Sequence, residues 1–213
     1  AGGVDEYLDA LEREIALYAA DESVGGVAFA TVYIGGGTPT ALTAPQLERL
    51  LDAITSGFRV APGAEITVEA NPGTLTEKKL RALQRGGVNR ISLGVQSLND
   101  ELLRAIGRIH AARHARESYE RARALFDNVS LDLIYGLPGQ DEADWRATLT
   151  EIARWRPEHL SCYSLIVEDG TLFGELYAQG RLQLPGDDDA LAMYEFTIKF
   201  LGDRGYDHYE ISN

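Results

Sequence analysis

The sequence predicts an α/β protein in which parallel strands form a partial barrel around a polar interior. Segments typical of strands alternate with segments typical of helices, which is the pattern of βα units and of a parallel sheet. The strands are expected to begin near residues 31, 65, 90, 129 and 159, a spacing that leaves room for a helix after each strand. Aliphatic side chains occupy one side of the middle strands, and small or polar side chains occupy the other.

This alternation decides between an open doubly wound sheet and a barrel. Within residues 64–71, Ile66 and Val68 alternate with Thr67 and Glu69, and the next two strands repeat the pattern. A sheet covered by helices on both faces would show nearly continuous aliphatic runs. An ordinary eight-stranded barrel fills its interior with Val, Ile and Leu. Polar residues on one face therefore favour a barrel whose interior is a ligand cavity.

The individual elements are predicted from apolar periodicity and from the glycine, proline and capping residues at their ends. An amphipathic helix over 4–20 comes first and is followed by a loop over 21–26. Strands are expected over 31–34, 64–71, 89–96, 129–135, 159–166 and 206–211. Helices are expected over 44–55, 76–86, 99–106, 111–125, 141–155, 171–180 and 187–201.

A glycine-rich turn over 31–39 links the first strand to its helix. Its Thr-Val-Tyr-Ile start suits a buried strand, and Gly35, Gly36 and Gly37 follow directly. Thr43 and Gln46 then have the spacing of a capping box. Ligands of α/β proteins bind beyond the carboxyl ends of strands, so the turn is a candidate site, although a tight turn without a ligand remains the alternative. The dinucleotide and phosphate-loop fingerprints are both absent from the sequence.

Polar side chains at the carboxyl ends of three further strands complete the candidate rim. Glu69, Gln96 and Asp132 each lie on the polar side of the expected strand. Taken singly, each has a structural alternative, as a solvent-facing acid, a helix cap or an ion-pair partner of Arg90 or Arg108. Their common parity on consecutive strands favours a shared ligand site.

Other polar side chains are assigned more weakly. Arg108 follows the third βα unit and is suited to a ligand carboxylate. The role of His110 is left open, Cys162 is assigned to core packing, and His159 is assigned to the opposite end of the barrel.

Composition limits the classes of function. Acidic side chains number 33 against 20 basic ones, for a formal net charge of −13, which opposes binding to nucleic acid. No apolar run reaches the roughly 18 residues of a membrane span, and no signal peptide is visible. The single cysteine, Cys162, excludes an internal disulfide and fits a cytoplasmic location. One cysteine also cannot hold a metal cluster by itself.

Six short motifs stand in an order that is specific to one family. Together they resemble the radical S-adenosylmethionine (radical SAM) enzymes of the oxygen-independent coproporphyrinogen III oxidase family, over residues 31–213. The haem-chaperone branch of that family is the most similar. The motifs are Gly-Gly-Thr-Pro at 36–39, Val-Glu-Ala-Asn-Pro at 68–72, Gly-Val-Gln-Ser at 94–97, Ile-Gly-Arg-Ile-His at 106–110, Asp-Leu-Ile-Tyr-Gly-Leu-Pro at 132–138 and Tyr-Glu-Ile-Ser-Asn at 209–213.

The resemblance implies a TIM-like partial (β/α)6 barrel that binds S-adenosylmethionine and a 4Fe-4S cluster. By position, Gly36, Gly37 and Thr38 correspond to the turn that holds the methionine end of the cofactor. Further cofactor contacts are implied for Glu69, Gln96, Arg108, Asp132 and Ile166. No catalytic residue is assigned.

The family's cluster-binding motif, Cys-x-x-x-Cys-x-x-Cys, is absent from this sequence. We therefore expect a fragment that lacks the first barrel strand and is inactive by itself. In this interpretation residues 1–166 form the partial barrel. Residues 167–213 hold the last helices and strand before a further domain.

Three functions follow from these observations. The first is a haem chaperone that passes haem to a haem-accepting protein. The second is the oxidase of porphyrin biosynthesis, in which a 5′-deoxyadenosyl radical abstracts hydrogen from a propionate of coproporphyrinogen, which then loses carbon dioxide. The third is a TIM-like hydrolase or aldolase without a cofactor, which the lack of a lysine nucleophile or a His/Asp metal set at a strand end disfavours.

Overall fold

The computed structural model of the protein describes residues 2–211 and divides them into two compact units. The first unit comprises residues up to 93 together with 118–129, and the second comprises 94–117 together with 130 onward. Five strands follow one another in chain order within the sheet, β1-β2-β3-β4-β5. The boundaries between the two units fall inside three elements, β3 (Arg90–Gln96), α6 (Ala112–Arg123) and β4 (Asn128–Tyr135).

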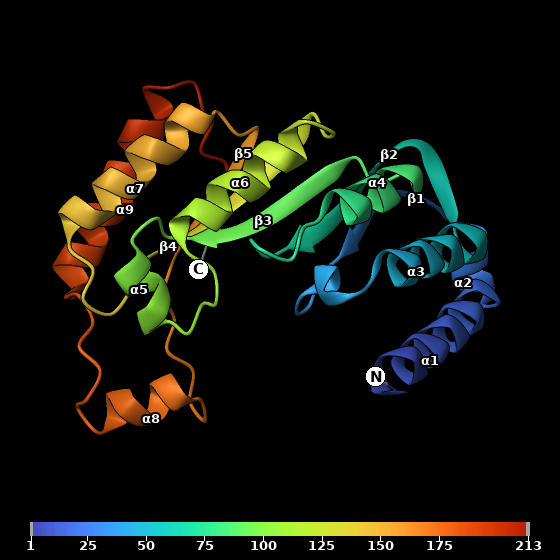
Figure 1. Ribbon diagram of the computed structural model, residues 1–213, viewed down its shortest axis with the longest axis horizontal. Helices are drawn as coiled ribbons and strands as arrows, with labels where there is room; N and C mark the ends of the chain where they lie inside the picture. Colours follow the sequence, from blue (N-terminus) through green and yellow to red (C-terminus); the bar gives the residue numbers. More distant parts are fainter. Residues whose placement is uncertain (1, 212–213) are drawn as a thin grey trace. The chain divides into compact units, whose positions relative to one another are not determined.

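The first unit begins with two helices and then alternates strands with helices (Figure 1). Strand β1 pairs in parallel with β2, and β2 pairs in parallel with β3, so that Tyr33 lies beside Thr67 and Glu69 beside Ser92. Besides the start of β3 and the end of α6, the elements are α1 (Gly2–Ala19), α2 (Glu22–Gly25), β1 (Ala28–Ile34), the 3-10 turn η1 (Pro39–Ala41), α3 (Ala44–Gly57), β2 (Arg59–Ala70) and α4 (Glu77–Arg85).

The aliphatic face of β2 and β3 forms the core of this unit. Ile66, Val68, Ile91 and Leu93 are buried, as are the apolar sides of α3 and α4. Each fully buried aliphatic side chain contributes about 1.5–3 kcal/mol. Asn89 anchors the start of this face, because it accepts from the Ile66 amide and donates to the Ala64 carbonyl, both at 2.8 Å.

The second unit continues the same alternation. Strands β4 and β5 pair in parallel, which places Asp132 beside Ser161 and Leu133 beside Cys162. Its elements, besides the end of β3, the start of α6 and most of β4, are α5 (Asp100–Ala105), α7 (Glu142–Trp155), β5 (His159–Ser164), α8 (Leu172–Ala178) and α9 (Asp187–Gly202).

Trp145 joins α7 to α9, which lie side by side (Figure 1). The ring is fully buried against Tyr135 of β4, with ring centroids 5.5 Å apart. Its indole nitrogen donates to the hydroxyl of Thr197 at 2.8 Å and to the carbonyl of Met193 at 3.2 Å. A buried indole that finds hydrogen-bond acceptors keeps its large apolar contribution without an unpaired donor.

The structure confirms the predicted α/β class with parallel strands and corrects three details. The expected loop over 21–26 contains the short helix α2, which Asp21 caps through the Ser23 amide. Strand β1 is not buried, and Tyr33 is 59% exposed, because β1 is an edge strand paired only with β2 among the described strands. The expected strand over 206–211 is not formed.

Side chains rather than a backbone ladder anchor that last segment. The hydroxyl of Tyr206 donates to the carbonyl of Pro157 at 2.6 Å, and the hydroxyl of Tyr209 lies 2.7 Å from His159 Nε2. The last two residues of the Tyr-Glu-Ile-Ser-Asn motif, Ser212 and Asn213, lie outside the described residues. The predicted domain division at residue 166 stays a prediction.

Candidate functional site

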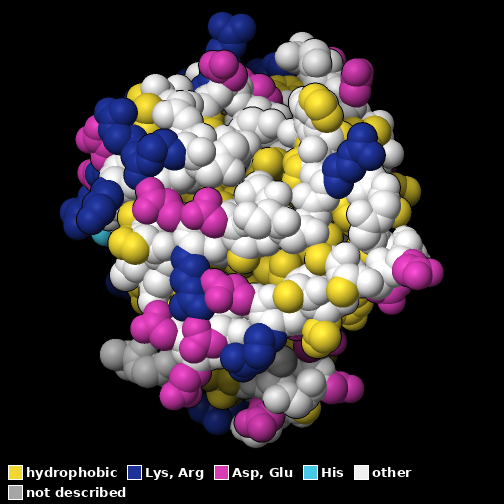
Figure 2. Space-filling view, turned by 90° about the vertical axis from the view of Figure 1, so that its right-hand side faces the viewer, with side chains coloured by type: hydrophobic (Ala, Val, Ile, Leu, Met, Phe, Trp, Pro, Cys, Tyr) yellow, Lys and Arg dark blue, Asp and Glu magenta, His cyan; other side chains and the backbone are white. Residues whose placement is uncertain are grey.

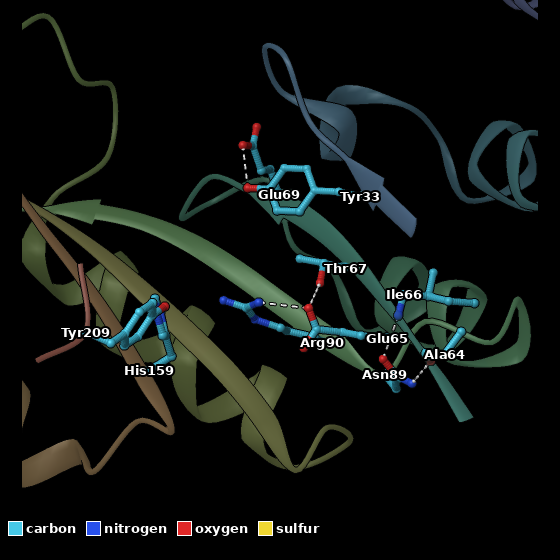
Figure 3. Close-up of polar contacts among 10 residues, drawn as sticks. All are labelled: Tyr33, Ala64, Glu65, Ile66, Thr67, Glu69, Asn89, Arg90, His159 and Tyr209. Carbon is cyan, nitrogen blue, oxygen red and sulfur yellow. Dashed lines mark hydrogen bonds and ion pairs between the residues drawn. The ribbon is translucent and has the colours of Figure 1, made fainter. Parts of the chain in front are cut away.

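The glycine turn after β1 is bonded to Glu69 of β2. Tyr33 of β1 contacts the same carboxylate (Figure 3). One carboxylate oxygen of Glu69 accepts from the Tyr33 hydroxyl at 2.7 Å, and the other accepts from the Gly36 amide at 3.1 Å. A Cβ at Gly35 would lie 2.7 Å from both the Glu69 carboxyl carbon and the Tyr33 ring. Glycine at position 35 is therefore what allows these two side chains to pack against the turn.

The next two glycines leave their backbone open. The φ angles of Gly36 and Gly37 are 86° and 132°, which L side chains rarely adopt. Apart from the glycine itself and its two chain neighbours, no heavy atom of the described residues lies within 4 Å of the position that a Cβ would take at either glycine. The turn thus presents peptide groups that a ligand can approach closely.

Hydrogen bonds join the glycine turn and the adjacent 3-10 turn η1 to the loop that follows β2. Asn71 donates to the hydroxyl of Thr38 at 2.7 Å, and the hydroxyls of Thr40 and Thr74 lie 2.6 Å apart. The Lys79 ammonium, at the start of α4, donates to the carbonyls of Thr40 at 2.6 Å and Thr74 at 3.2 Å. Burial lowers the pKa of Lys79. These bonds hold the two loops as one body.

Glu65 and Glu69 stand in different electrostatic surroundings. Glu65 forms an ion pair with Arg90 at 2.9 Å and also accepts from Thr67 at 3.1 Å (Figure 3). The hydrogen-bond donors to Glu69 are a phenol and a peptide amide, both neutral. Neither neutral donor offsets the formal charge of the carboxylate, so Glu69 is suited to pair with a cationic ligand group.

In the second unit, Gln96 ends β3 in a strained conformation. Its φ is 68°, and the Ser97 amide donates to the Val95 carbonyl at 2.9 Å. A three-residue turn with a positive φ at its central residue is the rare, strained form of the γ-turn. The Gln96 side chain is buried and accepts from the Tyr163 hydroxyl at 3.3 Å. Strained non-glycine residues cluster at ligand sites, so this turn is a candidate site feature.

Asp132 lies half-buried on β4, on the same face as Tyr163. The register pairs Asp132 with Ser161 and Ile134 with Tyr163, and alternate residues of a strand share a face. Burial, with a smaller effect from the Asp132 carboxylate, raises the pKa of the Cys162 thiol to about 12. Cys162 is therefore protonated at neutral pH and unsuited to ligate a metal as a thiolate.

The remaining predicted residues lie in loops of the second unit. Arg108 is half-buried in the connection after α5, and Ile166 follows β5 with 51% of its surface exposed. His110, for which the sequence indicates no single role, is buried in the loop that also contains Arg108. His159 begins β5 and contacts Tyr209 (Figure 3).

The structure thus joins Gly36, Gly37, Thr38 and Glu69 in the first unit, and it places Gln96, Arg108, Asp132 and Ile166 in the second. Sequence reasoning missed Tyr33, Asn71 and Tyr163, which hold the candidate residues in place. Tyr33 could have been found from the sequence, because it alternates with Val32 and Ile34 and so shares the side of β1 on which Thr31 lies.

Comparison with known proteins supplies the family. Residues 4–152 match the model of the radical SAM superfamily. Heme chaperone HemW of Bacillus subtilis is 43% identical over 99% of this chain and 55% of its own length. Heme chaperone HemW of Escherichia coli is 39% identical over 98% of this chain and 53% of its own length. The chain spans about half the length of these relatives.

A solved structure, coproporphyrinogen III oxidase (HemN) from Escherichia coli, superposes with a TM-score of 0.83 and 34% identity. The match covers 95% of this chain and 46% of that one. The solved structure is described as a radical SAM enzyme. The family match, the sequence identity and the shared partial-barrel fold agree, and the chain belongs to the radical SAM superfamily.

Proposed function

We propose that this chain is the core of a cytoplasmic haem chaperone that binds S-adenosylmethionine and haem and passes haem to a haem-accepting protein. Its similarity to haem chaperones of the superfamily, 43% and 39% identity over nearly the whole chain, carries the proposal. Nucleic acid is an unfavourable partner for a chain with a net charge of −13. Basic and acidic side chains are interspersed on the face that Figure 2 shows.

The residues of the candidate site suit S-adenosylmethionine. Its ammonium and carboxylate need hydrogen-bonding groups at close range, which the open peptide groups of Gly36 and Gly37 offer. Its ammonium and sulfonium are cations, for which the Glu69 and Asp132 carboxylates are suitable partners. When bound in this superfamily, the cofactor supplies radical chemistry. Arg108 and Ile166 are proposed as further contacts from their matching positions in the motifs.

The same residues do not suit a 4Fe-4S cluster. Cluster irons are held by cysteine thiolates, and this sequence has one cysteine, whose thiol pKa is raised to about 12. In the part of the chain that the structure describes, no group of three or more His, Cys, Asp or Glu side chains is arranged to hold a metal ion. The cluster of the proposed function therefore depends on ligands outside this sequence.

None of the described helices combines the length and apolarity that crossing a bilayer requires. The proposed haem partner rests on the similarity to haem chaperones. The full-length protein is used to test the proposal. Haem is titrated into it while the Soret absorbance is followed, and S-adenosylmethionine binding is measured by calorimetry. Saturable binding of both ligands is expected, and failure to bind haem overturns the proposal.

The oxidase is the second candidate, because the solved coproporphyrinogen III oxidase structure superposes over 95% of the chain. The two functions differ in their products. An oxidase with its cluster, S-adenosylmethionine, a reductant and a one-electron acceptor for the substrate radical converts coproporphyrinogen propionates to vinyl groups and releases carbon dioxide. The chaperone leaves coproporphyrinogen unchanged, so carbon dioxide release measured by mass spectrometry separates the two.

A further inference from the structure

His110 contacts the backbone of the strained turn at Gln96. Its side chain is buried, with 5% of the residue exposed, and Nε2 lies 3.2 Å from the Val95 carbonyl oxygen. The same carbonyl accepts the Ser97 amide, which closes the γ-turn around Gln96. Val95, Gln96, Ser97 and His110 all belong to the second unit. One carbonyl oxygen thus receives a donor from within the turn and a second donor from a separate loop.

The loop between α5 and α6 is built to carry His110 inward. Gly107 has a φ of 69°, and the Arg108 amide donates to the Leu103 carbonyl at 2.9 Å, which closes the end of α5. Two residues later His110 is buried, whereas Ile109 between them is 93% exposed. The chain therefore turns His110 toward β3 while its neighbour points to solvent.

We infer that His110 is a positioning residue, which holds the Gln96 turn in the conformation that presents the Gln96 side chain to the cofactor. The inference rests on the proposed function, in which Gln96 contacts S-adenosylmethionine. A central residue with φ of 68° relaxes toward an ordinary strand conformation unless its surroundings hold it. The Tyr163 hydroxyl restrains the end of the side chain, and His110 restrains the peptide in front of it.

The protonation state of His110 agrees with this role. Burial lowers its pKa, and the charges of Arg108 and His114 lower it further, whereas the Val95 carbonyl and Asp100 act in the opposite direction. The imidazole is then neutral at pH 7. A neutral ring with Nε2 facing a carbonyl oxygen carries its proton on Nε2 and donates it.

Two variants of similar size separate the hydrogen bond from simple packing. His110→Gln keeps a donor that can reach the Val95 carbonyl, and His110→Leu removes the donor. His114→Leu is the matched control, since His114 lies nearby at the start of α6 and accepts its hydrogen bonds from the Ala111 amide and the Arg113 guanidinium. Each change is made in the full-length, cluster-loaded protein, and S-adenosylmethionine affinity is measured by calorimetry.

His110→Leu is expected to weaken S-adenosylmethionine binding about three- to tenfold, the scale of one neutral hydrogen bond. His110→Gln and His114→Leu should stay within about twofold of the parent. In a Gln96→Ala background, His110→Leu should cause no further loss, because His110 acts through Gln96. Equal losses for the Leu and Gln variants, or independent losses in the double variant, overturn the inference.

Two measurements without cofactor keep this test separate from that of the proposed function. In the unliganded protein, His110→Leu should speed hydrogen exchange at the Ser97 amide at least severalfold, and unchanged exchange contradicts the inference. In the parent protein, nitrogen NMR should find the His110 proton on Nε2. A proton on Nδ1 instead overturns the inference even where the Leu variant fails to fold. A parent protein that binds no S-adenosylmethionine defeats the cofactor assignment, and the exchange and NMR results still decide the role of His110.

Discussion

The hydroxyl of Tyr33 donates a 2.7 Å hydrogen bond to the carboxylate of Glu69 on the neighbouring strand. The residue directly opposite Tyr33 is Thr67, so the phenol reaches diagonally toward the carboxyl end of β2. The other carboxylate oxygen accepts from Gly36. Through Glu69, therefore, an exposed tyrosine fixes the turn that is proposed to hold the methionine end of S-adenosylmethionine.

Tyr33→Phe removes this hydrogen bond and keeps the ring. Because the phenol is exposed, we expect a modest loss of S-adenosylmethionine affinity in the full-length protein, about 0.5–1.5 kcal/mol. Thermal stability should barely change. Calorimetric titration checks the prediction, with Tyr177→Phe as the control at another exposed tyrosine. Identical affinities for both variants and the parent would show that Tyr33 does not position Glu69.

Gly35→Ala tests the close packing of the turn. The new methyl group would lie 2.7 Å from the Glu69 carboxyl carbon, so the side chains of Tyr33 and Glu69 must move. Overpacking of this kind typically costs about 1–3 kcal/mol, measured as the free energy of unfolding in urea. Gly26→Ala is the control, because its φ is −93° and its Cβ position is open. A Gly35→Ala variant as stable as the control would contradict the packing described.

Lys79→Met tests the clamp between the two loops. The substitution keeps most of the aliphatic chain and removes the donors to the Thr40 and Thr74 carbonyls. Hydrogen bonds from a charged group contribute about 1.5–3 kcal/mol. Because Lys79 is only half-buried, we expect the substitution to lower the free energy of unfolding by about half of this. Hydrogen exchange of the amides in the 36–41 turn should become faster. The neighbouring Lys78 is exposed, so Lys78→Met should leave exchange unchanged, and equal effects of the two variants would refute the clamp.

The buried His110 predicts a pH dependence of stability. Its pKa in the folded protein lies below the ordinary value of 6.5, so the unfolded chain binds its proton first as the pH falls. The contribution of His110 to the free energy of unfolding is therefore complete above pH 6.5 and declines as the pH falls below it. The free energy of unfolding of the parent, relative to that of His110→Gln, should therefore be lower at about pH 5 than at pH 8. A pH-independent difference would contradict the lowered pKa.

The sequence was sufficient for the alternation of strands and helices, because the two kinds of element differ in their apolar period. The common cavity expected for Glu69, Gln96 and Asp132 stays a prediction. The sequence was insufficient for the exposure of β1. The β-branched and aromatic residues of this segment are typical of a buried strand, but β1 lies at the edge of the sheet and Tyr33 is exposed. The γ-turn at Gln96 was equally out of reach, because glutamine carries no signal for a positive φ. Such a turn depends on partners distant in sequence, here Tyr163 and His110.

The last segment shows the same limit. A strand was expected over 206–211, yet Tyr206 and Tyr209 bond to Pro157 and His159 through their side chains. A strand needs a partner edge with free peptide groups as well as a suitable pattern.

Transfer of haem from the full-length protein to an apo haem protein tests the central claim most directly. The two proteins are mixed, and the Soret spectrum of the acceptor is followed in the presence of S-adenosylmethionine and coproporphyrinogen. We predict that the acceptor gains haem at a rate above that from free haem, while coproporphyrinogen keeps its propionates. Decarboxylation of coproporphyrinogen without haem transfer would contradict the account and identify an oxidase.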